Sequence, residues 1–401
     1  MPPLSYKEGD DDYNMDSTPQ KRRRLGSFDP DATPRRQGSL SIPSSSASFS
    51  ASEASSRQLS AKAQIMSLRL VDTGIEYETL DEDSELPEAA KMLFNTMSEI
   101  ERGLGIIPDA LKQTIFDDQE LTPESFEGSR WKYCFKPGDD NLPGRIPSVA
   151  QVKHILAMAT ECEKCKHEEA SWNATVHHSL ARFIFNDDLG KQCDDFNAII
   201  CTTARPHKDF RPVLASAKLI DICIYAALDQ YPELVTAMKA FSSTTPTKSV
   251  NPTEYFALQL RPVVVTIETK QPSGGEAREK AQLQMGVWHA SQWAFLYTGV
   301  RQKLLDQRMA QGLEVPTDGF KAETLQVLSK LGFIPGIYIN GHQWYFVIST
   351  YEGGKTTFRS EWLFGETKSL MKIYSVIAGV RELTAWGRDT YLPWFKENIL
   401  T

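Results

Sequence analysis

The sequence is poor in cysteine, and it has no long apolar run. Six cysteines among 401 residues are too few for the disulfide framework of a small secreted domain, and the first residues contain no apolar stretch typical of a signal peptide. No run approaches the roughly 18 apolar residues that a membrane-spanning helix needs. We therefore expect a reducing, intracellular compartment and no membrane partner.

The sequence also lacks an excess of positive charge. It has 44 basic and 52 acidic residues, a net charge of −8, and the first sixty residues contain eight of each sign. This balance argues against a broadly basic surface for nucleic acid. It leaves room for a metal-dependent nuclease, because a site for a divalent cation must itself be acidic.

Residues 1–62 are polar and of low complexity. Half of the tract from Ser39 to Ser60 is serine, and a basic cluster stands at Lys21–Arg24. Such composition predicts a disordered tail. The basic cluster resembles a nuclear import signal read by the import machinery, although a solvated run of charge explains it equally well. We expect a nuclear location, with the cytoplasm as the alternative.

Apolar residues at helical spacing predict helices in the next part of the chain. One helix is expected over 86–102, within an accessory helical region at 63–147. A second is expected over 148–185, with breaks, at the start of the main domain at 148–401. After Gly190 the pattern of residues becomes typical of β-strands.

Strands are predicted at 196–204, 218–228 and 261–270, the last carrying the β-branched run Val263, Val264, Val265. A linker rich in Ser, Thr and Pro is expected between the second and third strands, and a helix over 276–296 after the third. Asn340-Gly341 signals a hairpin between two further strands, KTTFRSEW at 355–362 suggests another, and helices are expected near 366–384 and 390–399.

Two strands bring charged side chains together. Glu268 and Lys270 are two residues apart in a strand and therefore share a face. Asp221 lies among apolar residues, where a charge is costly unless it is paired or binds metal. If the strands pair, Asp221 and Glu268 could hold Mg²⁺ through oxygen, and Lys270 would orient a water or stabilise charge on a phosphate. A surface Glu–Lys pair explains the spacing without function.

These residues resemble the PD-(D/E)XK nuclease-like domain found in proteins of filamentous fungi. The resemblance rests on EASWNATVH at 169–177, KLIDICI at 218–224, NPTEY at 251–255, RPVVVTIETK at 261–270 and AQLQMGVWHASQW at 281–293. It implies a restriction-endonuclease-like α/β (α+β) core of α-β-β-β-α-β order, with a mixed central sheet flanked by helices. It also implies that Asp221 and Glu268 bind metal and that Lys270 is catalytic.

The same resemblance makes Glu169 an additional acidic metal ligand on the leading helix. Glu168 is an equally plausible choice, and a solvated glutamate is the simpler explanation for either. Ile220 stands where the superfamily name has proline. That departure removes a backbone constraint and no chemical group.

Gln284 resembles the glutamine that related nucleases place beside the site, with Trp288 four residues later as in a Q-x-x-x-aromatic motif. Helical spacing places Gln284 among core-facing residues and turns Gln282 away. A buried glutamine bonded to backbone is the alternative without function.

Two other motifs give little support for a functional site. Cys162 and Cys165 form a C-x-x-C pair near His167, but no second pair follows, as a zinc site would require. GGKTT at 353–357 lacks the first glycine of a phosphate-binding loop, since Ser349 occupies that position, and a hairpin turn explains it.

The sequence therefore predicts a nuclease that uses Mg²⁺ or Mn²⁺ to hydrolyse DNA with a metal-activated water, with RNA as a second candidate substrate. One alternative is a catalytically silent nuclease fold that binds nucleic acid or protein in the nucleus. Another is an interaction protein in which the tail is the functional part. The combination of Asp221, Glu268 and Lys270 favours the enzyme.

Overall fold

A computed structural model describes residues 59–117, 131–213, 215, 220–272, 275–314, 316 and 319–400. The chain divides into two units, Met1–Arg57 and Gln58–Thr401, and the description concerns the second. The basic cluster Lys21–Arg24 and the predicted tail up to residue 58 lie outside the described residues. Within the described part, no helix is both long and apolar enough to cross a membrane.

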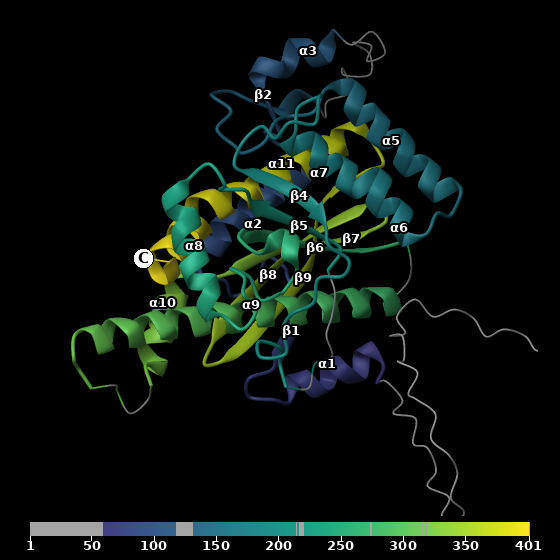
Figure 1. Ribbon diagram of the computed structural model, residues 1–401. Helices are drawn as coiled ribbons and strands as arrows, with labels where there is room; N and C mark the ends of the chain where they lie inside the picture. The colour runs from purple at the N-terminus through teal and green to yellow at the C-terminus, as the bar shows by residue number, and fades with distance from the viewer. Residues whose placement is uncertain are drawn as a thin grey trace, which may run out of the picture. The chain divides into compact units, whose positions relative to one another are not determined.

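A seven-stranded mixed sheet forms the centre of the second unit (Figure 1). Its spatial order is β1 (Ile75–Thr79), β9 (Lys355–Glu366), β8 (Gln343–Glu352), β7 (Ile334–Asn340), β6 (Val263–Lys270), β5 (Ile222–Ala226) and β4 (Phe196–Ile200). The pairs β1–β9 and β6–β7 are parallel, and the other four are antiparallel. Short strands β2 (Ile107–Pro108) and β3 (Phe135–Lys136) pair separately.

The described helices surround this sheet. They are α1 (Ala61–Arg69), α2 (Glu88–Glu101), α3 (Lys112–Phe116), α5 (Val149–Lys164), α6 (Glu169–Trp172), α7 (His178–Phe185), α8 (Pro232–Thr244), α9 (Gly275–Ala310), α10 (Lys321–Leu331), α11 (Leu370–Trp386) and α12 (Leu392–Phe395). Three π-helical turns continue these helices, at Asn173–His177, Gly387–Tyr391 and Lys396–Leu400. The order α7-β4-β5-β6-α9-β7 is the predicted α-β-β-β-α-β core, with α8 inserted between β5 and β6 and α10 inserted before β7.

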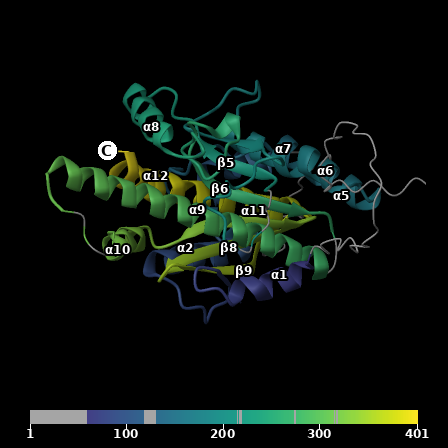
Figure 2. The ribbon, with the colours of Figure 1, turned by 60° about the horizontal axis from the view of Figure 1, so that its bottom comes forward.

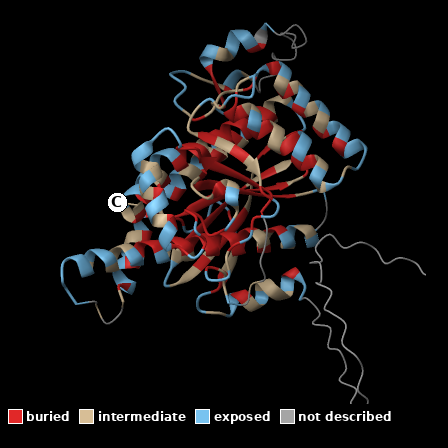
Figure 3. Ribbon diagram, in the orientation of Figure 1, coloured by how far each residue is buried: buried red, intermediate tan, exposed pale blue. Residues whose placement is uncertain are grey.

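Two hydrophobic clusters cover the two faces of the sheet. Helices α2, α5, α7 and α11 contribute to the larger cluster, together with Ile222 and Ile267. Helix α1 and the first half of α9 form the smaller one, against Cys223 and Tyr338, while the second half of α9 joins the larger one from Trp293 onwards. Figures 1 and 2 show α9 and α1 on one side of the strands and α5, α7 and α11 on the other, and Figure 3 shows the buried strands between them. Cross-strand alternation therefore decides which helices each side chain meets.

Local sequence explains where the helices leading into the core begin. Ser148 caps α5 by accepting a hydrogen bond from the Gln151 backbone, and the Gln151 side chain accepts one from the Ser148 backbone, a capping box. Helix α9 begins at Gly275, as expected, but runs on to Ala310. Its central turns are buried, and the polar turns beyond Val300 contain no helix breaker until Gly312, whose φ is 68°.

Three expectations differ from the structure. The segment expected to be a linker contains α8, which begins with Pro232 in its first turn, a position that suits proline. The region at 63–147, expected to be helical, also contains a strand, because β1 joins the edge of the main sheet beside β9. The hairpin turn is Gly341-His342 rather than Asn340-Gly341, because Asn340 pairs with Gln343.

Candidate active site at the end of β6

The end of β6 carries the predicted carboxylate and lysine. Glu268 is fully buried, and the Lys270 side chain is 12% exposed. Lys270 Nζ lies 2.5 Å from Glu268 Oε1 and donates to the Thr269 carbonyl at 2.8 Å. The two side chains share a face, as their spacing predicted, and the lysine is the part of this pair nearest to solvent.

Asp221 stands immediately before β5, at the point where β5 and β6 separate. Its backbone N–H donates to Ile267 O at 3.2 Å, and its own carbonyl accepts from Cys201 N at 2.8 Å. Its carboxylate Oδ2 accepts from the backbone N–H and the hydroxyl of Thr269, both at 2.9 Å. Asp221 is thus 8% exposed and is fixed by the residue between Glu268 and Lys270. The sequence placed Asp221 within a strand and gave no sign of the Thr269 contact.

The structure distinguishes between the two glutamates on the leading helix. Glu169 Oε2 lies 3.5 Å from Lys270 Nζ, while Glu168 is exposed at the N-cap position of α6 and makes no side-chain capping hydrogen bond among the described residues. Glu169 is therefore part of the cluster around Lys270. Its described contact is with the lysine, so its role as a metal ligand stays a prediction.

A buried histidine ties the leading helix to the end of β6. His177 is 1% exposed, and its Nε2 lies 3.0 Å from Gly341 O, while Nδ1 lies 3.1 Å from the Asn173 side chain. A carbonyl only accepts, so Nε2 of His177 carries the proton. Gly341 N in turn donates to Lys270 O at 2.8 Å. Asn173 is one turn after Glu169, so this chain of contacts positions the helix beside Lys270.

The electrostatics of the cluster follow from burial and from the close lysine. Burial raises the pKa of Glu268, Lys270 opposes that rise, and Asp221 and Glu169 add to it. Burial alone would lower the pKa of Lys270, but Glu268, Glu169 and Asp221 outweigh it and raise that pKa. Lys270 is therefore a fixed positive charge, and the three carboxyl groups around it attract more positive charge.

The carboxylates fit a hard divalent cation. Glu268 Oε2 is buried and has no hydrogen-bond partner among the described residues, which is costly for such an atom. Oxygen atoms of Asp221 and Glu268 are the ligand type that Mg²⁺ prefers. Within the described ranges, no group of three or more His, Cys, Asp or Glu side chains could hold an ion alone. Water and substrate oxygens would complete the coordination shell.

Gln284 and Gln282 differ from the expectation for α9. Gln282 does not turn away from the core, because its Nε2 donates to Ser360 Oγ at 3.1 Å and to Glu361 Oε1 at 2.7 Å on β9. Gln284 is half-buried on the same helix, and its place beside the site stays a prediction. Residues two apart in a helix point in nearly opposite directions, and both glutamines are half-buried because the helix is surrounded by protein along its central turns.

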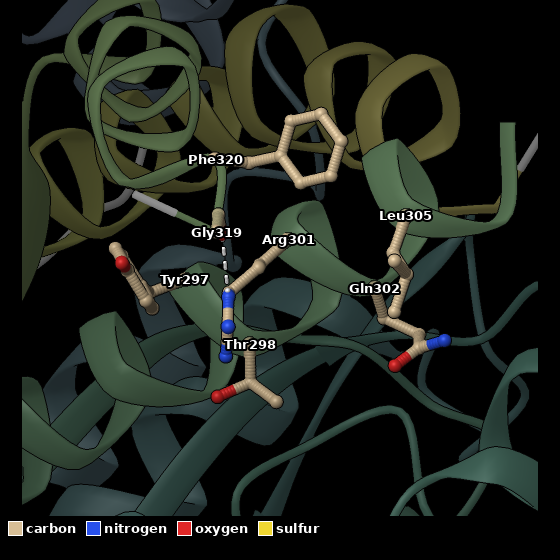
Figure 4. A pocket seen from close by; sticks show the side chains of 7 residues that line it. All are labelled: Tyr297, Thr298, Arg301, Gln302, Leu305, Gly319 and Phe320. Atoms are coloured by element: carbon tan, nitrogen blue, oxygen red, sulfur yellow. Dashed lines mark hydrogen bonds between the residues drawn. The ribbon is translucent and has the colours of Figure 1, made fainter. Parts of the chain in front are cut away.

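The remaining candidate features lie elsewhere. A cavity formed by the second half of α9 and the segment before α10 is drawn in Figure 4; it is lined by Tyr297, Thr298, Arg301, Gln302, Leu305, Gly319 and Phe320. It begins 22 residues along α9 from Gly275, about 33 Å at the helical rise. Cys162 Sγ lies 3.4 Å from His167 Nδ1, while Cys165 is exposed. Neither feature joins the cluster at Lys270.

The fold and the cluster at the end of β6 together define a nuclease-type core. The family described as "PD-(D/E)XK nuclease superfamily" matches residues 117–392, more than half of the chain. The chain belongs to this superfamily. No curated protein and no solved structure matched the chain.

Proposed function

We propose that this protein is a divalent-metal-dependent nuclease that hydrolyses phosphodiester bonds of DNA. The observation that carries the proposal is the buried cluster in which Lys270 contacts Glu268 and Glu169 beside a fixed Asp221. A purely structural ion pair needs no second and third carboxyl group. Membership of the nuclease superfamily supports a nucleic acid as substrate.

Asp221 and Glu268 would hold Mg²⁺ or Mn²⁺, which when bound lowers the pKa of a water and offsets charge on a phosphate. Thr269 holds the Asp221 carboxylate in place through two hydrogen bonds. Lys270 is kept protonated by its carboxylate neighbours and would donate to the attacking water or to a phosphate oxygen. Glu169 limits the freedom of the Lys270 ammonium group.

The test is cleavage of linear, circular and single-stranded DNA, and of RNA, by the full chain with and without Mg²⁺ or Mn²⁺. Wild type should cleave DNA only with metal, and Asp221→Ala, Glu268→Gln and Lys270→Ala should each lose most of the rate. Glu168→Gln is the matched control, since Glu168 is exposed. Equal cleavage by wild type and the three site variants would point to a contaminant and reject the proposal.

The second candidate is a silent nuclease fold that binds nucleic acid or protein. It is favoured by one observation: Glu268 is fully buried, and one of its oxygens is already held by Lys270. A silent fold would bind DNA without metal-dependent cleavage, and it would keep its DNA affinity in Glu268→Gln. A nuclear location is compatible with both candidate functions. It is tested by comparing the location of a fluorescent fusion with and without Lys21–Arg24.

A further inference from the structure

A tyrosine that the sequence did not single out faces the same space as the catalytic pair. Tyr338 on β7 is the direct cross-strand partner of Glu268 on β6, so the two side chains leave the sheet on one face. This is the face covered by α9, because Tyr338 belongs to the cluster that includes Ala281 and Met285. The tyrosine is 4% exposed.

The Tyr338 hydroxyl has no hydrogen-bond partner within the described part of the chain. Glu268 Oε2, on the neighbouring strand, has none either. Buried polar groups are nearly always paired, and each one left alone costs roughly 1–3 kcal/mol. Two such atoms at paired positions of adjacent strands indicate a polar ligand between the sheet and α9.

The surroundings of Tyr338 favour an anionic ligand. Burial raises the pKa of Tyr338 to about 12; the positive charges of Lys270 and Arg278 oppose that rise, and Tyr345 and Glu268 add to it. The hydroxyl therefore stays protonated at neutral pH and acts as a donor. Arg278, in the first turns of α9, also forms an ion pair with Glu361 on β9. Lys270 and Arg278 are thus two cationic donors in the surroundings of the Tyr338 hydroxyl.

The neighbouring tyrosine supplies a contrast. Tyr345 on β8 is paired with Tyr338, and the two rings stack with centroids 5.5 Å apart and planes 18° from parallel. The stack holds the Tyr338 ring in one orientation. The Tyr345 hydroxyl, however, donates to Gln343 Oε1 at 2.9 Å. The Tyr345 hydroxyl is therefore hydrogen-bonded within the protein, whereas the Tyr338 hydroxyl has no hydrogen-bond partner among the described residues.

We propose that Tyr338 is a substrate-binding residue whose hydroxyl donates a hydrogen bond to a phosphodiester oxygen beside Lys270. The proposal rests on the nuclease function proposed above and adds a residue to that site. A protonated hydroxyl is a poor ligand for a divalent cation. In this proposal Tyr338 therefore binds the phosphate, and Glu268 binds the metal ion. The substrate is the sugar–phosphate strand of a nucleic acid, bound across β6 and β7.

The experiment compares Tyr338→Phe with the matched control Tyr345→Phe and with Glu268→Gln in the full chain. Binding of a short fluorescent DNA duplex is measured in Ca²⁺, and Mn²⁺ affinity is measured by titration calorimetry. Tyr338→Phe should weaken DNA binding roughly ten- to a hundredfold, the value of a hydrogen bond to a charged group, and leave Mn²⁺ affinity unchanged. Glu268→Gln should lose Mn²⁺ binding, and Tyr345→Phe should resemble wild type in both measurements.

Thermal melting provides a readout that distinguishes binding from folding. Tyr338→Phe removes an unpaired buried hydroxyl, so its melting temperature should equal or exceed that of wild type. DNA affinity of Tyr338→Phe within twofold of wild type overturns the inference, and so does a loss of Mn²⁺ affinity without a loss of DNA affinity. If wild type binds DNA but cleaves nothing, the proposed nuclease function fails, and the binding comparison still decides the role of Tyr338.

Discussion

The carboxylate of Asp221 accepts two hydrogen bonds from Thr269, one from its backbone N–H and one from its hydroxyl, each at 2.9 Å. Thr269 is fully buried and stands between Glu268 and Lys270. One residue of β6 therefore orients a carboxylate that stands immediately before the neighbouring strand β5. The spacing of Asp221 from the other two residues of the site depends on this contact.

Thr269→Val removes the hydroxyl at nearly constant volume. Asp221 would keep one of its two hydrogen bonds, and loss of a partner that orients a metal ligand typically costs ten- to a hundredfold in affinity. We expect Mn²⁺ affinity, measured by calorimetry, to fall within this range. Thr269→Ser retains the hydroxyl and should bind Mn²⁺ as wild type does. Equal weakening in both variants would contradict a role for the hydrogen bond.

Lys270→Met, alone and combined with Glu268→Gln, distinguishes the contribution of Lys270 to stability from its contribution to DNA cleavage. It leaves Glu268 buried without its cation, and breaking one side of a buried pair costs about 3–5 kcal/mol. Urea unfolding at pH 8 should show this loss. The double variant Glu268→Gln with Lys270→Met should recover much of the free energy of unfolding and remain inactive in the DNA cleavage assay. A double variant as unstable as Lys270→Met would argue against this coupling.

Glu169→Gln and Glu168→Gln form a matched pair on the leading helix. Glu169 contacts Lys270 at 3.5 Å, whereas Glu168 is exposed. We expect Glu169→Gln to lower the cleavage rate about tenfold or more, because the lysine loses one of its two carboxylate partners. Glu168→Gln should match wild type. A larger effect at Glu168 would reverse this assignment.

Stability should fall in mild acid because of buried histidines. Burial lowers the pKa of His177 to about 4 and that of His289 to about 3, both below the unfolded value near 6.5. The unfolded chain therefore takes up protons first, so the stabilisation is complete above about pH 6.5 and is lost as pH falls towards 4. At pH 5, the shifted pKa of His177 should lower the free energy of unfolding by roughly 2 kcal/mol relative to pH 7.

Urea unfolding at pH 7 and pH 5 measures this effect. His177→Gln should reduce the difference in unfolding free energy between the two pH values. His154→Gln, at an exposed position, should leave that difference as in wild type. An unchanged pH dependence in His177→Gln would refute the assignment.

Gly286→Ala tests the packing of α9 against β1. A Cβ at Gly286 would lie 2.6 Å from ring and hydroxyl atoms of Tyr77, and Tyr77 is confined in the smaller cluster. Overpacking of this kind typically costs 1–3 kcal/mol. Gly275→Ala, at the start of the same helix, meets no described atom within 4 Å and should unfold in urea as wild type does.

Sequence patterns located most of the core elements because those elements have regular periodicity. The β-branched run of β6 and the spacing of Glu268 and Lys270 were both readable in this way. Helix α8 was missed because its C-terminal Ser and Thr residues look like a linker, and β1 was missed because its partner β9 is nearly 300 residues away. A cross-strand partner at such a separation has no local signal.

For the site as well, contacts within one element could be predicted from the sequence, and contacts between elements could not. Residues two apart in one strand could be assigned to one face. The roles of Thr269 and Tyr338 depend on how β5, β6 and β7 align, and the choice of Glu169 over Glu168 depends on how the leading helix meets Lys270. His177 stacks on Trp172 within the leading helix. Its contact with Gly341 could not be foreseen.

The position of β6 has a consequence for dynamics. This strand is paired with β5 as far as Ile267 and with β7 as far as Lys270, so the backbone leading up to Glu268 can open only when ladders on both sides break. Its amides should be among the slowest to exchange hydrogen with solvent, close to the limit set by global unfolding. The pair of Glu268 and Lys270 would then be as durable as the fold itself, and adjustment to a bound molecule would fall to the side chain of Lys270 and to the helix that carries Glu169.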